Sequence, residues 1–397
     1  MSVRKRKWTT AKGVVKEAWQ VDYTDGQGKR QRQSFAKKKV ADAFLLKAQG
    51  EVRDGVHVPD SETITISAAG DLWLKSGAAA GLERTTIDQR RQHLALHIKP
   101  LIGNTKLNKV TVPWVRNFQD QLREQGRSPA MVKRVTVSLG SIFADAQLRG
   151  HAIRNPVHEM SRAKSSRAKV EKRQQKRLEV GVDIPTTAEI KALIGAAAGR
   201  WRPLFITAVF TGLRASELRG LRWADVDLSA AVLHVRQRAD RYHDIGMPKT
   251  DAGQRKVPLT PMTVNTLREW KLACPKGQLD LVFPTGAGKV EGHSNMVNRG
   301  LIPTLIEANV TVRTAGDAEG QPIANAKYKG LHALRHWYAS WCINRRAEGG
   351  LELTPKQVQE RMGHSNISVT LDTYSHLFPA QDEQAALGAA EQSIFGV

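Results

Sequence analysis

Residues 211–218 read Thr-Gly-Leu-Arg-Ala-Ser-Glu-Leu and directly follow an apolar run that begins at Pro203. The run predicts a buried helix, and Gly212 would end it, because glycine readily adopts the left-handed conformation that follows many helices. Arg214 would then stand at the start of the next helix. A lone arginine in such a place is usually a surface or ion-pairing residue, so the stretch gains meaning only from partners elsewhere in the chain.

Three further motifs follow in the C-terminal half. Residues 331–336 read Leu-His-Ala-Leu-Arg-His, which puts His332 and Arg335 three positions apart and so on one helical face. Met362-Gly-His364 comes ten residues before Tyr374. Between these motifs and residue 218, the pattern predicts strands over 231–236, 243–249 and 255–259, and a polar turn separates the last two.

Other catalytic motifs are incomplete. Gly286-Ala-Gly-Lys289 resembles half of a phosphate-binding loop, but no Ser or Thr follows the lysine. His332 and His336 are four apart on one predicted helix, yet no Glu follows His332, so the zinc-protease pattern is absent. Carboxylates are scattered, without an evident set for two metal ions. The sequence predicts neither a metal site nor a cofactor.

Composition favours a nucleic-acid partner. The chain has 397 residues, and 61 Lys and Arg against 38 Asp and Glu give a net charge of +23. Two cysteines are too few for a disulfide framework, which is typical of a reducing cytosol. No apolar run approaches a membrane span, and the basic N-terminus lacks the apolar core of a secretory signal. We therefore expect a cytoplasmic, nucleoid-associated protein with no membrane partner.

The pattern predicts a multidomain α+β protein. Residues 1–63 alternate around an Asp25-Gly26 turn and then become helical, which indicates a small sheet with one helix. Residues 64–160 read as a module of four or five helices. Residues 161–182 form a basic, apolar-poor linker, and 183–397 a mainly α domain with a small antiparallel sheet and a tail after Pro379.

Taken together, the motifs resemble those of the tyrosine recombinase (phage integrase) family. The family pattern has Arg in a Thr-Gly-Leu-Arg box, Lys on a β-hairpin, His-x-x-Arg, Gly-His and Tyr, and this chain has them in the same order. The resemblance is strong over residues 183–380 and rests on layout over 1–160. It implies a lambda-type integrase: a three-stranded arm-binding domain, a helical core-binding domain and a catalytic domain.

The resemblance also implies a metal- and ATP-independent reaction. Tyr374 would attack the scissile phosphorus and form a 3′-phosphotyrosine, which stores the bond energy for religation. Arg214 and Arg335 would clamp the phosphate, since forked guanidinium groups match its oxygens. Lys249 would protonate the leaving 5′-oxygen, with Lys256 across the turn as the competitor.

Three more residues take supporting roles in this family. His332 would assist proton transfer to or from the tyrosine and leaving oxygens, and His364 would bond the phosphate. Glu217 matches a position that supports the active site, although it could equally be a surface helix residue.

DNA contacts are expected outside the active site. Arg30 and Arg32 on the third predicted strand would contact bases or phosphates, or else form a solvated strand face. The linker would lie along phosphates, or be a solvated charge run. Its candidate residues are Arg162, Lys164, Arg167, Lys169, Lys172 and Arg173.

The function implied by the resemblance is integration and excision of a mobile element, from a phage or another element, through a Holliday junction. The partners would be double-stranded attachment sites with core and arm sequences, three further copies in a homotetramer, and possible bending and excisionase or directionality factors. The tail would dock on a neighbouring protomer or on its own domain. Alternatives are a monomeric type IB topoisomerase, against which the arm-like module argues, a chromosome-dimer resolvase, and a non-catalytic DNA-binding regulator.

Overall fold

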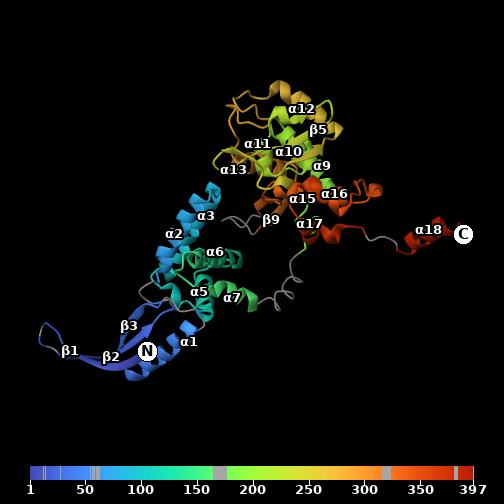
Figure 1. Ribbon diagram of the computed structural model, residues 1–397. Helices are drawn as coiled ribbons and strands as arrows, with labels where there is room; N and C mark the ends of the chain where they lie inside the picture. Colours follow the sequence, from blue (N-terminus) through green and yellow to red (C-terminus); the bar gives the residue numbers. More distant parts are fainter. Residues whose placement is uncertain are drawn as a thin grey trace. The chain divides into compact units, whose positions relative to one another are not determined.

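The N-terminal residues form a three-stranded antiparallel sheet covered on one face by a helix (Figure 1). Its elements are β1 (Ser2–Thr9), β2 (Val15–Thr24), β3 (Arg30–Phe35) and α1 (Lys38–Arg53). Asp25 begins the turn between β2 and β3, and its Oδ1 accepts a 2.9 Å hydrogen bond from the Lys29 amide. Gly28 in that turn has a φ of +80°, which glycine adopts without strain. The predicted sheet and its turn are confirmed.

The two faces of this sheet differ in character. Val21 and Tyr23 of β2 pack against α1, where Tyr23 meets the Phe44 ring edge-on at 5.7 Å between centroids. Alternation along the strand turns Asp22 to the other face. There it lies opposite Arg32 of β3 in the strand register. The sheet therefore has an apolar face under the helix and a polar, arginine-bearing face.

Residues 66–163 form a helical module with its own core. Its helices are α2 (Ile66–Ala79), α3 (Arg84–His93), the π-helical η1 (Leu94–Ile98), α4 (Lys99–Ile102), α5 (Val112–Glu124), α6 (Pro129–Leu148) and α7 (Pro156–Ala163). Trp73, Phe118 and Phe143 are buried in the core. Ser128 caps α6 by accepting from the Met131 amide, as the Ser-Pro start predicts. The helical character predicted for this region is confirmed.

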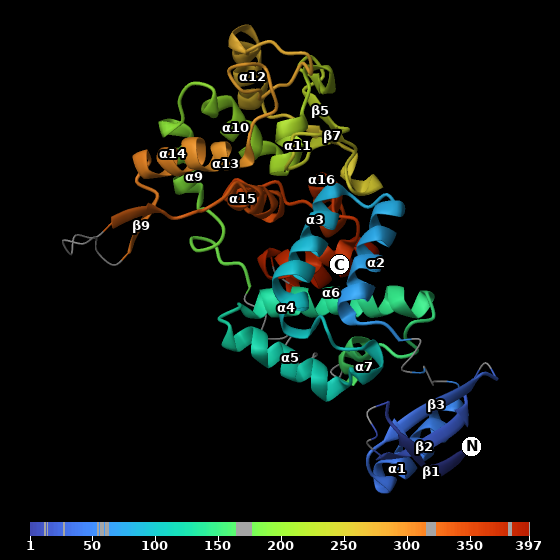
Figure 2. The same ribbon diagram turned by 90° about the vertical axis from the view of Figure 1, so that its left-hand side faces the viewer.

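The chain divides into two compact units, residues 1–175 and 176–397, in the computed structural model. Figure 2 gives a second view of the elements of each unit. The structure describes residues 1–11, 13, 15–26, 28–53, 55, 59, 63–163, 177–314, 323–379 and 383–396. Within the predicted linker, residues 161–163 belong to α7, and Leu178 packs against the core of the second unit.

The second unit is mainly helical around a large apolar core. Its helices are α9 (Thr187–Ala196), α10 (Trp201–Thr211), α11 (Ala215–Gly220), α12 (Pro261–Ala273), α13 (His293–Asn295), the π-helical η5 (Met296–Leu301), α14 (Ile302–Glu307), α15 (His332–Ile343), α16 (Pro355–Met362), α17 (Ile367–Tyr374) and α18 (Glu383–Phe395), with short 3₁₀ turns between them. Thr186 and Glu189 form the predicted capping box of α9. Helix α10 is buried along most of its length and contacts α12 and α15.

Three small antiparallel sheets occur among the described residues of this unit. One has the order β4-β5-β8, another pairs β6 with β7, and the third pairs β9 with β10. The strands are β4 (Val226–Asp227), β5 (Val232–Val235), β6 (Arg238–Ala239), β7 (Ile245–Gly246), β8 (Arg255–Pro258), β9 (Thr311–Thr314) and β10 (Ile323–Ala326). The mixed α+β fold with small sheets is the one that the sequence predicts.

The predicted strand over 243–249 is wrong in length and partner. Only Ile245 and Gly246 form a strand there, and they pair with β6 rather than with β8. Pro248 follows two residues later and has no amide hydrogen to give to a sheet, which fits the early end of the strand. β8 pairs with β5 instead. Across the described ranges, no helix has the length and apolar character that crossing a bilayer requires.

Candidate active site

Arg335 is a deeply buried charged residue of the second unit. It lies in α15, and its side chain is almost fully buried, at 2% exposure. One Nη donates to the carbonyl of Gly212 at the end of α10, and the other to the carbonyl of Met362 at the end of α16. These bonds use two of the five N–H donors of a guanidinium. The helix ends therefore fix its orientation and leave donors for an anion.

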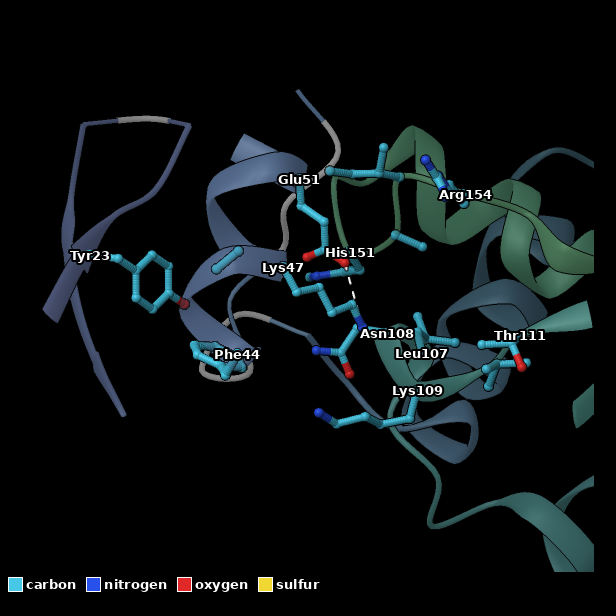
Figure 3. Close-up of a pocket in the computed structure, with 14 residues that line it drawn as sticks. Tyr23, Phe44, Lys47, Glu51, Leu107, Asn108, Lys109, Thr111, His151 and Arg154 are labelled. Atoms are coloured by element: carbon cyan, nitrogen blue, oxygen red, sulfur yellow. Dashed lines mark ion pairs between the residues drawn. The ribbon is translucent and has the colours of Figure 1, made fainter. Parts of the chain in front are cut away.

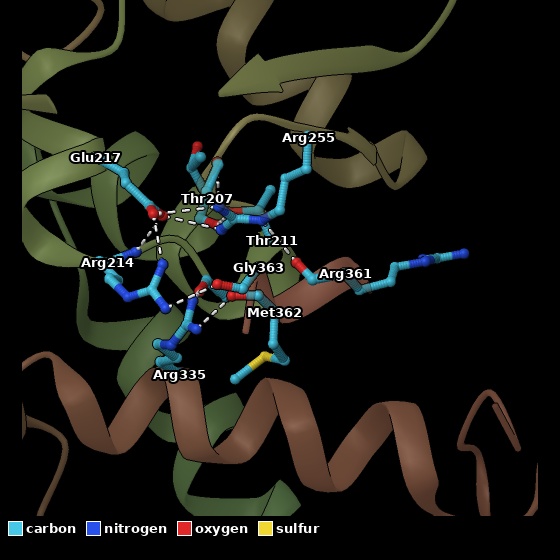
Figure 4. A network of polar contacts seen from close by, with 11 residues as sticks. Thr207, Thr211, Arg214, Glu217, Arg255, Arg335, Arg361, Met362 and Gly363 are labelled. Carbon is cyan, nitrogen blue, oxygen red and sulfur yellow. Dashed lines mark hydrogen bonds and ion pairs between the residues drawn. The ribbon is translucent and has the colours of Figure 1, made fainter. Parts of the chain in front are cut away.

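Glu217 joins two further arginines (Figure 4). Its carboxylate accepts from Arg214 Nη1 at 2.8 Å and from the Arg214 amide at 2.8 Å. Arg255 of β8 binds both carboxylate oxygens, at 3.1 and 2.9 Å. Glu217 is 3% exposed, and burial by itself would raise its pKa. The charges and hydrogen bonds of Arg255 and Arg214 outweigh burial and lower the pKa to about 2.

A second set of contacts runs from these arginines to the end of α16. Arg214 Nη2 donates to the Gly363 carbonyl at 3.0 Å, and Arg255 Nε donates to the Arg361 carbonyl at 2.8 Å. Together with the bond from Arg335 to Met362, three consecutive carbonyls each accept from a different arginine. Figure 4 shows these groups converging from separate segments of the chain. The α16 terminus is thus the common anchor of the arginine cluster.

Two glycines allow the helix ends to lie this close to the arginine side chains and to Tyr338. Gly212 and Gly363 both have left-handed backbones, with φ of +59° and +61°, where other residues are strained. A Cβ on Gly212 would lie 2.3 Å from the Tyr338 ring, and a Cβ on Gly363 would lie 2.8 Å from Arg255 Nη1. The glycines in Thr-Gly-Leu-Arg and Met-Gly-His are therefore required by backbone conformation and by space.

Tyr374 ends α17 beside the cluster and is 2% exposed. The His364 ring is nearly parallel to the Tyr374 ring, at 9° and 6.5 Å between centroids. His364 Nδ1 lies 2.9 Å from the Oγ1 of Thr370, which is fully buried. Burial raises the pKa of Tyr374 to about 12, against the opposing effect of Arg335 and Arg214. The phenol is therefore protonated near neutral pH and needs a base to become a nucleophile.

The hydroxyl of Tyr374 is hydrogen-bonded to His336, whose Nδ1 lies 2.7 Å away. His332 meets the His336 ring edge to face, with centroids 4.5 Å apart. Burial lowers the pKa of His336 to about 4, with help from His332 and Arg335. The same two causes, burial and arginine charges, lower the pKa of His364 to about 4 and that of His332 below its usual value. All three imidazoles are neutral at pH 7.

The structure brings six of the seven predicted site residues into one region. Arg214, Glu217, Arg335, His364 and Tyr374 are connected as described, and His332 reaches Tyr374 through the His336 ring. Lys249 stands exposed in the loop between β7 and β8, and not on a hairpin strand as expected. Lys256, its competitor, lies exposed on β8 opposite His234.

The predicted DNA-binding residues fall only partly within the described ranges. Arg30 and Arg32 are exposed on the polar face of the sheet, where both pair with Asp22, at 3.6 and 3.0 Å. Arg4 of β1 pairs with the same carboxylate at 3.2 Å. Arg162 belongs to α7. The remaining linker candidates lie outside the described residues: Lys164, Arg167, Lys169, Lys172 and Arg173.

One cavity of the described chain lies apart from this chemistry. A cavity of about 380 Å³ in the first unit is lined by Tyr23, Phe44, Lys47 and Glu51 together with residues 107–111 and 151–154 (Figure 3). It contains none of the predicted catalytic side chains. Within the described ranges, no group of three or more His, Cys, Asp or Glu side chains is arranged to hold a metal ion.

Sequence reasoning missed two residues of the site. Arg255 binds Glu217, but a strand that alternates Arg255 with Lys256 does not tell which cation faces inward. His336 binds Tyr374, and its signal was present, since His336 lies four residues after His332 on one helix. That spacing fitted only the zinc-protease pattern, which is incomplete here.

Known proteins of related sequence are recombinases and integrases. The chain is 27% identical to the "Tyrosine recombinase XerC-like" protein of Caldanaerobacter subterraneus subsp. tengcongensis, over 93% of this chain and 95% of that protein. It is also 27% identical to the "Prophage integrase IntR" of Escherichia coli K12, over 80% of this chain and 77% of that protein.

Solved structures of similar fold are integrases. The Tn1549 transposon integrase in complex with transposon right end DNA matches with a TM-score of 0.62 and 20% identity, over 83% of this chain and all of that one. A lambda integrase dimer bound to a core site matches with a TM-score of 0.55 and 17% identity, over 94% of each chain. At these identities the likeness concerns the fold.

Two family descriptions match the chain directly. The phage integrase family matches residues 186–381, which include the arginine cluster and Tyr374. The N-terminal SAM-like domain of phage integrases matches residues 65–123 of the helical module. These matches together span more than half of the chain, and the relative that aligns over 93% of this chain is named a tyrosine recombinase. The chain belongs to the phage integrase family and is a tyrosine site-specific recombinase.

Proposed function

We propose that this recombinase integrates and excises a mobile element by cutting and rejoining DNA strands through a 3′-phosphotyrosine and a Holliday junction. The observation that carries the proposal is the convergence of Arg214 and Arg335 on the α16 terminus next to Tyr374. The names of its relatives support a mobile element as substrate: a prophage integrase, the ICEBs1 integrase of Bacillus subtilis and a transposon integrase.

The two arginines bind the scissile phosphate in this mechanism. The transition state places additional negative charge on the nonbridging oxygens, and guanidinium groups fixed beforehand stabilise it without reorganisation. Arg335 is held by two carbonyls, and Arg214 by Glu217 and Gly363. Glu217 acts as the support that the family resemblance implies, because it fixes Arg214 and neutralises part of the cluster's charge.

The reacting groups act on the two oxygens that exchange at phosphorus. Tyr374 attacks and remains bound to the 3′-phosphate, while Lys249 protonates the departing 5′-oxygen. Lys249 is exposed in the loop between β7 and β8, which leaves its ammonium group accessible to bound DNA, and Lys256 is the alternative acid. His364 bonds the phosphate, and His332 assists proton transfer.

Three parts of the chain share the task of holding DNA. We assign residues 1–63 to arm sites, 64–160 to the core site and 183–397 to catalysis, with the basic linker along the phosphates. The polar face of the sheet supports the first assignment, because Arg4, Arg30 and Arg32 are exposed there and a β-ribbon fits the major groove.

Recombination between two duplexes requires four active sites, so we propose a homotetramer on DNA. A solved lambda integrase tetramer bound to a Holliday junction has a similar fold, with a TM-score of 0.54. Exposed apolar side chains on α18, namely Leu387, Ile394 and Phe395, support docking of the tail on a neighbouring protomer. A DNA-bending protein and an excisionase or directionality factor would control direction, and the complex would act on the cytoplasmic nucleoid.

Trapping the covalent intermediate tests this function. A core-site duplex is first recovered by binding of the chain to a random-sequence duplex library, and it is then nicked so that the cleaved end diffuses away. The wild-type chain should accumulate a denaturant-resistant adduct through Tyr374, with a free 5′-hydroxyl on the DNA. Tyr374→Phe should give no adduct, whereas the matched control Tyr242→Phe should give the wild-type yield.

A junction assay separates the proposal from a topoisomerase. Two duplexes with the selected site should yield Holliday junctions and exchanged products. Relaxation of supercoiled DNA that lacks the site, without exchange, would instead identify a topoisomerase, and binding without an adduct would identify a regulator.

A further inference from the structure

The hydroxyl of Tyr374 has a partner that is not among the site residues predicted from the sequence. His336 belongs to α15 and directly follows Arg335, whose guanidinium binds the carbonyl of Met362. Its Nδ1 lies 2.7 Å from the phenolic oxygen, which is a normal length for a strong hydrogen bond. The rings meet at 63° with centroids 5.8 Å apart.

We propose that His336 is the general base of the cleavage step and accepts the phenolic proton from Tyr374 as the tyrosine attacks phosphorus. The inference rests on the proposed function, since it assigns a proton within that reaction. The O–H bond of Tyr374 breaks and its proton moves to His336 Nδ1, while the new O–P bond forms. The bond from phosphorus to the 5′-oxygen breaks, and that oxygen takes a proton from Lys249. In religation both protons return.

The surroundings of His336 suit a proton acceptor. A general base must be unprotonated before the reaction, and burial together with His332 and Arg335 keeps this imidazole neutral by lowering its pKa. Asp183, on the segment before α9, acts in the opposite direction and favours the imidazolium once it has formed. A bound phosphodiester adds negative charge beside Arg335, which would raise the basicity of His336 when substrate arrives.

The geometry distinguishes His336 from its neighbour. His332 lies one helical turn earlier and presents its edge or face to the His336 ring, rather than lying against the hydroxyl. His364 is parallel to the Tyr374 ring and bonds Thr370 through Nδ1. Among these three imidazoles, the one hydrogen-bonded to the reacting oxygen in the described structure is that of His336.

The test distinguishes removal of the proton from the Tyr374 hydroxyl from protonation of the leaving 5′-oxygen. His336→Asn keeps a hydrogen-bonding group near the Nδ1 position but cannot take up a proton, and His336→Ala removes both functions. Each is assayed in the full chain on the selected nicked duplex, and on the same duplex with sulfur replacing the bridging 5′-oxygen. Sulfur leaves without protonation, so it removes the need for a general acid. Lys249→Ala and the exposed His293→Asn serve as comparisons.

We expect both His336 variants to cleave about 10²- to 10⁴-fold more slowly than wild type on the oxygen and sulfur substrates alike. The rate of His336→Asn should rise about tenfold per pH unit between pH 6 and 9, because only the tyrosinate form then reacts, while the wild-type rate stays nearly flat. His293→Asn should match wild type. DNA affinity and the melting temperature of His336→Asn should remain near wild type.

Three results would overturn the inference. The first is a His336→Asn rate within about threefold of wild type, which would make the hydrogen bond a matter of positioning. The second is a wild-type cleavage rate for His336→Asn on the sulfur-substituted duplex, which would mean that His336 protonates the leaving 5′-oxygen. The third is a flat pH profile for His336→Asn. If wild type forms no adduct, or Tyr374→Phe still forms one, the proposed function fails instead.

Discussion

In two regions of this recombinase, several arginines bind a single carboxylate, and the two clusters differ in how far solvent reaches them. Around Asp22, whose own side chain is 9% exposed, the side chains of Arg4, Arg30 and Arg32 are 59–63% exposed and contact the carboxylate from the solvent side. Around Glu217, which is 3% exposed, Arg255 is 5% exposed and Arg214 is 38% exposed. Solvent weakens the first set of ion pairs, whereas the second is enclosed and has backbone carbonyls as additional partners.

In the proposed mechanism, this difference separates the residues that would hold DNA from those that would react with it. The exposed arginines of the sheet can exchange a carboxylate for a phosphate at little cost, so they suit binding that must also release. The arginines around Glu217 cannot rearrange without breaking bonds to the end of α16, so in the proposed mechanism they would present a fixed charge pattern to one phosphate. Arginine side chains can therefore change partners in the first unit, whereas in the second unit they are fixed in place before a substrate binds.

The largest expected effect comes from removing the buried carboxylate. Glu217→Ala leaves Arg255 and Arg214 without their shared counter-ion in a low-dielectric site, and it should lower the free energy of unfolding of the second unit by about 3–5 kcal/mol. Asp22→Ala should change the stability of the sheet by less than about 1 kcal/mol. Hydrogen exchange at α10 and at β2 in the full chain measures the two. Equal losses would contradict the contrast between the clusters.

A charge-preserving change tests preorganisation next. Arg335→Lys keeps the charge but cannot bond both helix-end carbonyls and a phosphate with forked geometry. Cleavage of the selected duplex should fall about 10²- to 10³-fold, while affinity for that duplex changes little. Arg32→Lys in the sheet is the matched control and should leave cleavage within about threefold of wild type. A mild effect at Arg335 would mean that charge alone suffices there.

Acid should affect the enclosed cluster in a defined pH window. The pKa of Glu217 is about 2 in the folded protein, against 4.5 for a glutamate in water. A lowered folded pKa gives stability that is complete above the unfolded value and is lost as pH falls from about 4.5 toward 2. Over this window, the unfolding free energy of wild type should drop by about 3 kcal/mol more than that of Glu217→Gln. Parallel acid titrations of the two proteins would show that Glu217 carries no such linkage.

The smallest effect is expected on the exposed face. The double change Arg30→Gln and Arg32→Gln should reduce the slope of log affinity against log salt by about one for each phosphate contact removed. Affinity for arm-site duplexes should fall several-fold, while adduct formation on the core-site duplex stays unchanged. The converse variant Asp22→Asn removes the competing carboxylate and should strengthen arm-site binding. An unchanged salt slope in the double variant would remove this face from the DNA interface.

The sequence predicts the arginine cluster in part, for reasons that particular residues make clear. Arg214, Arg335 and Tyr374 occur in spaced motifs, Gly212 ends α10 just before Arg214, and Asn366 caps the helix that ends at Tyr374. Arg255 has no motif, because its partner Glu217 lies 38 residues away and only the fold brings them together. The strand expected over 243–249 fails because β7 ends at Gly246, two residues before Pro248, and Lys249 therefore lies in a loop.

The acceptors that hold the arginines also bear on how this recombinase can change. Arg335 and Arg214 rest on the main-chain oxygens of Gly212, Met362 and Gly363, which no side-chain substitution deletes. Substitutions around these main-chain oxygens therefore leave the acceptors of the two guanidinium groups in place. If exposed residues such as Arg30 and Arg32 contact DNA as proposed, new target sequences could be acquired through them without change to the chemistry. Main-chain anchoring in this way uncouples the evolution of target choice from that of strand transfer.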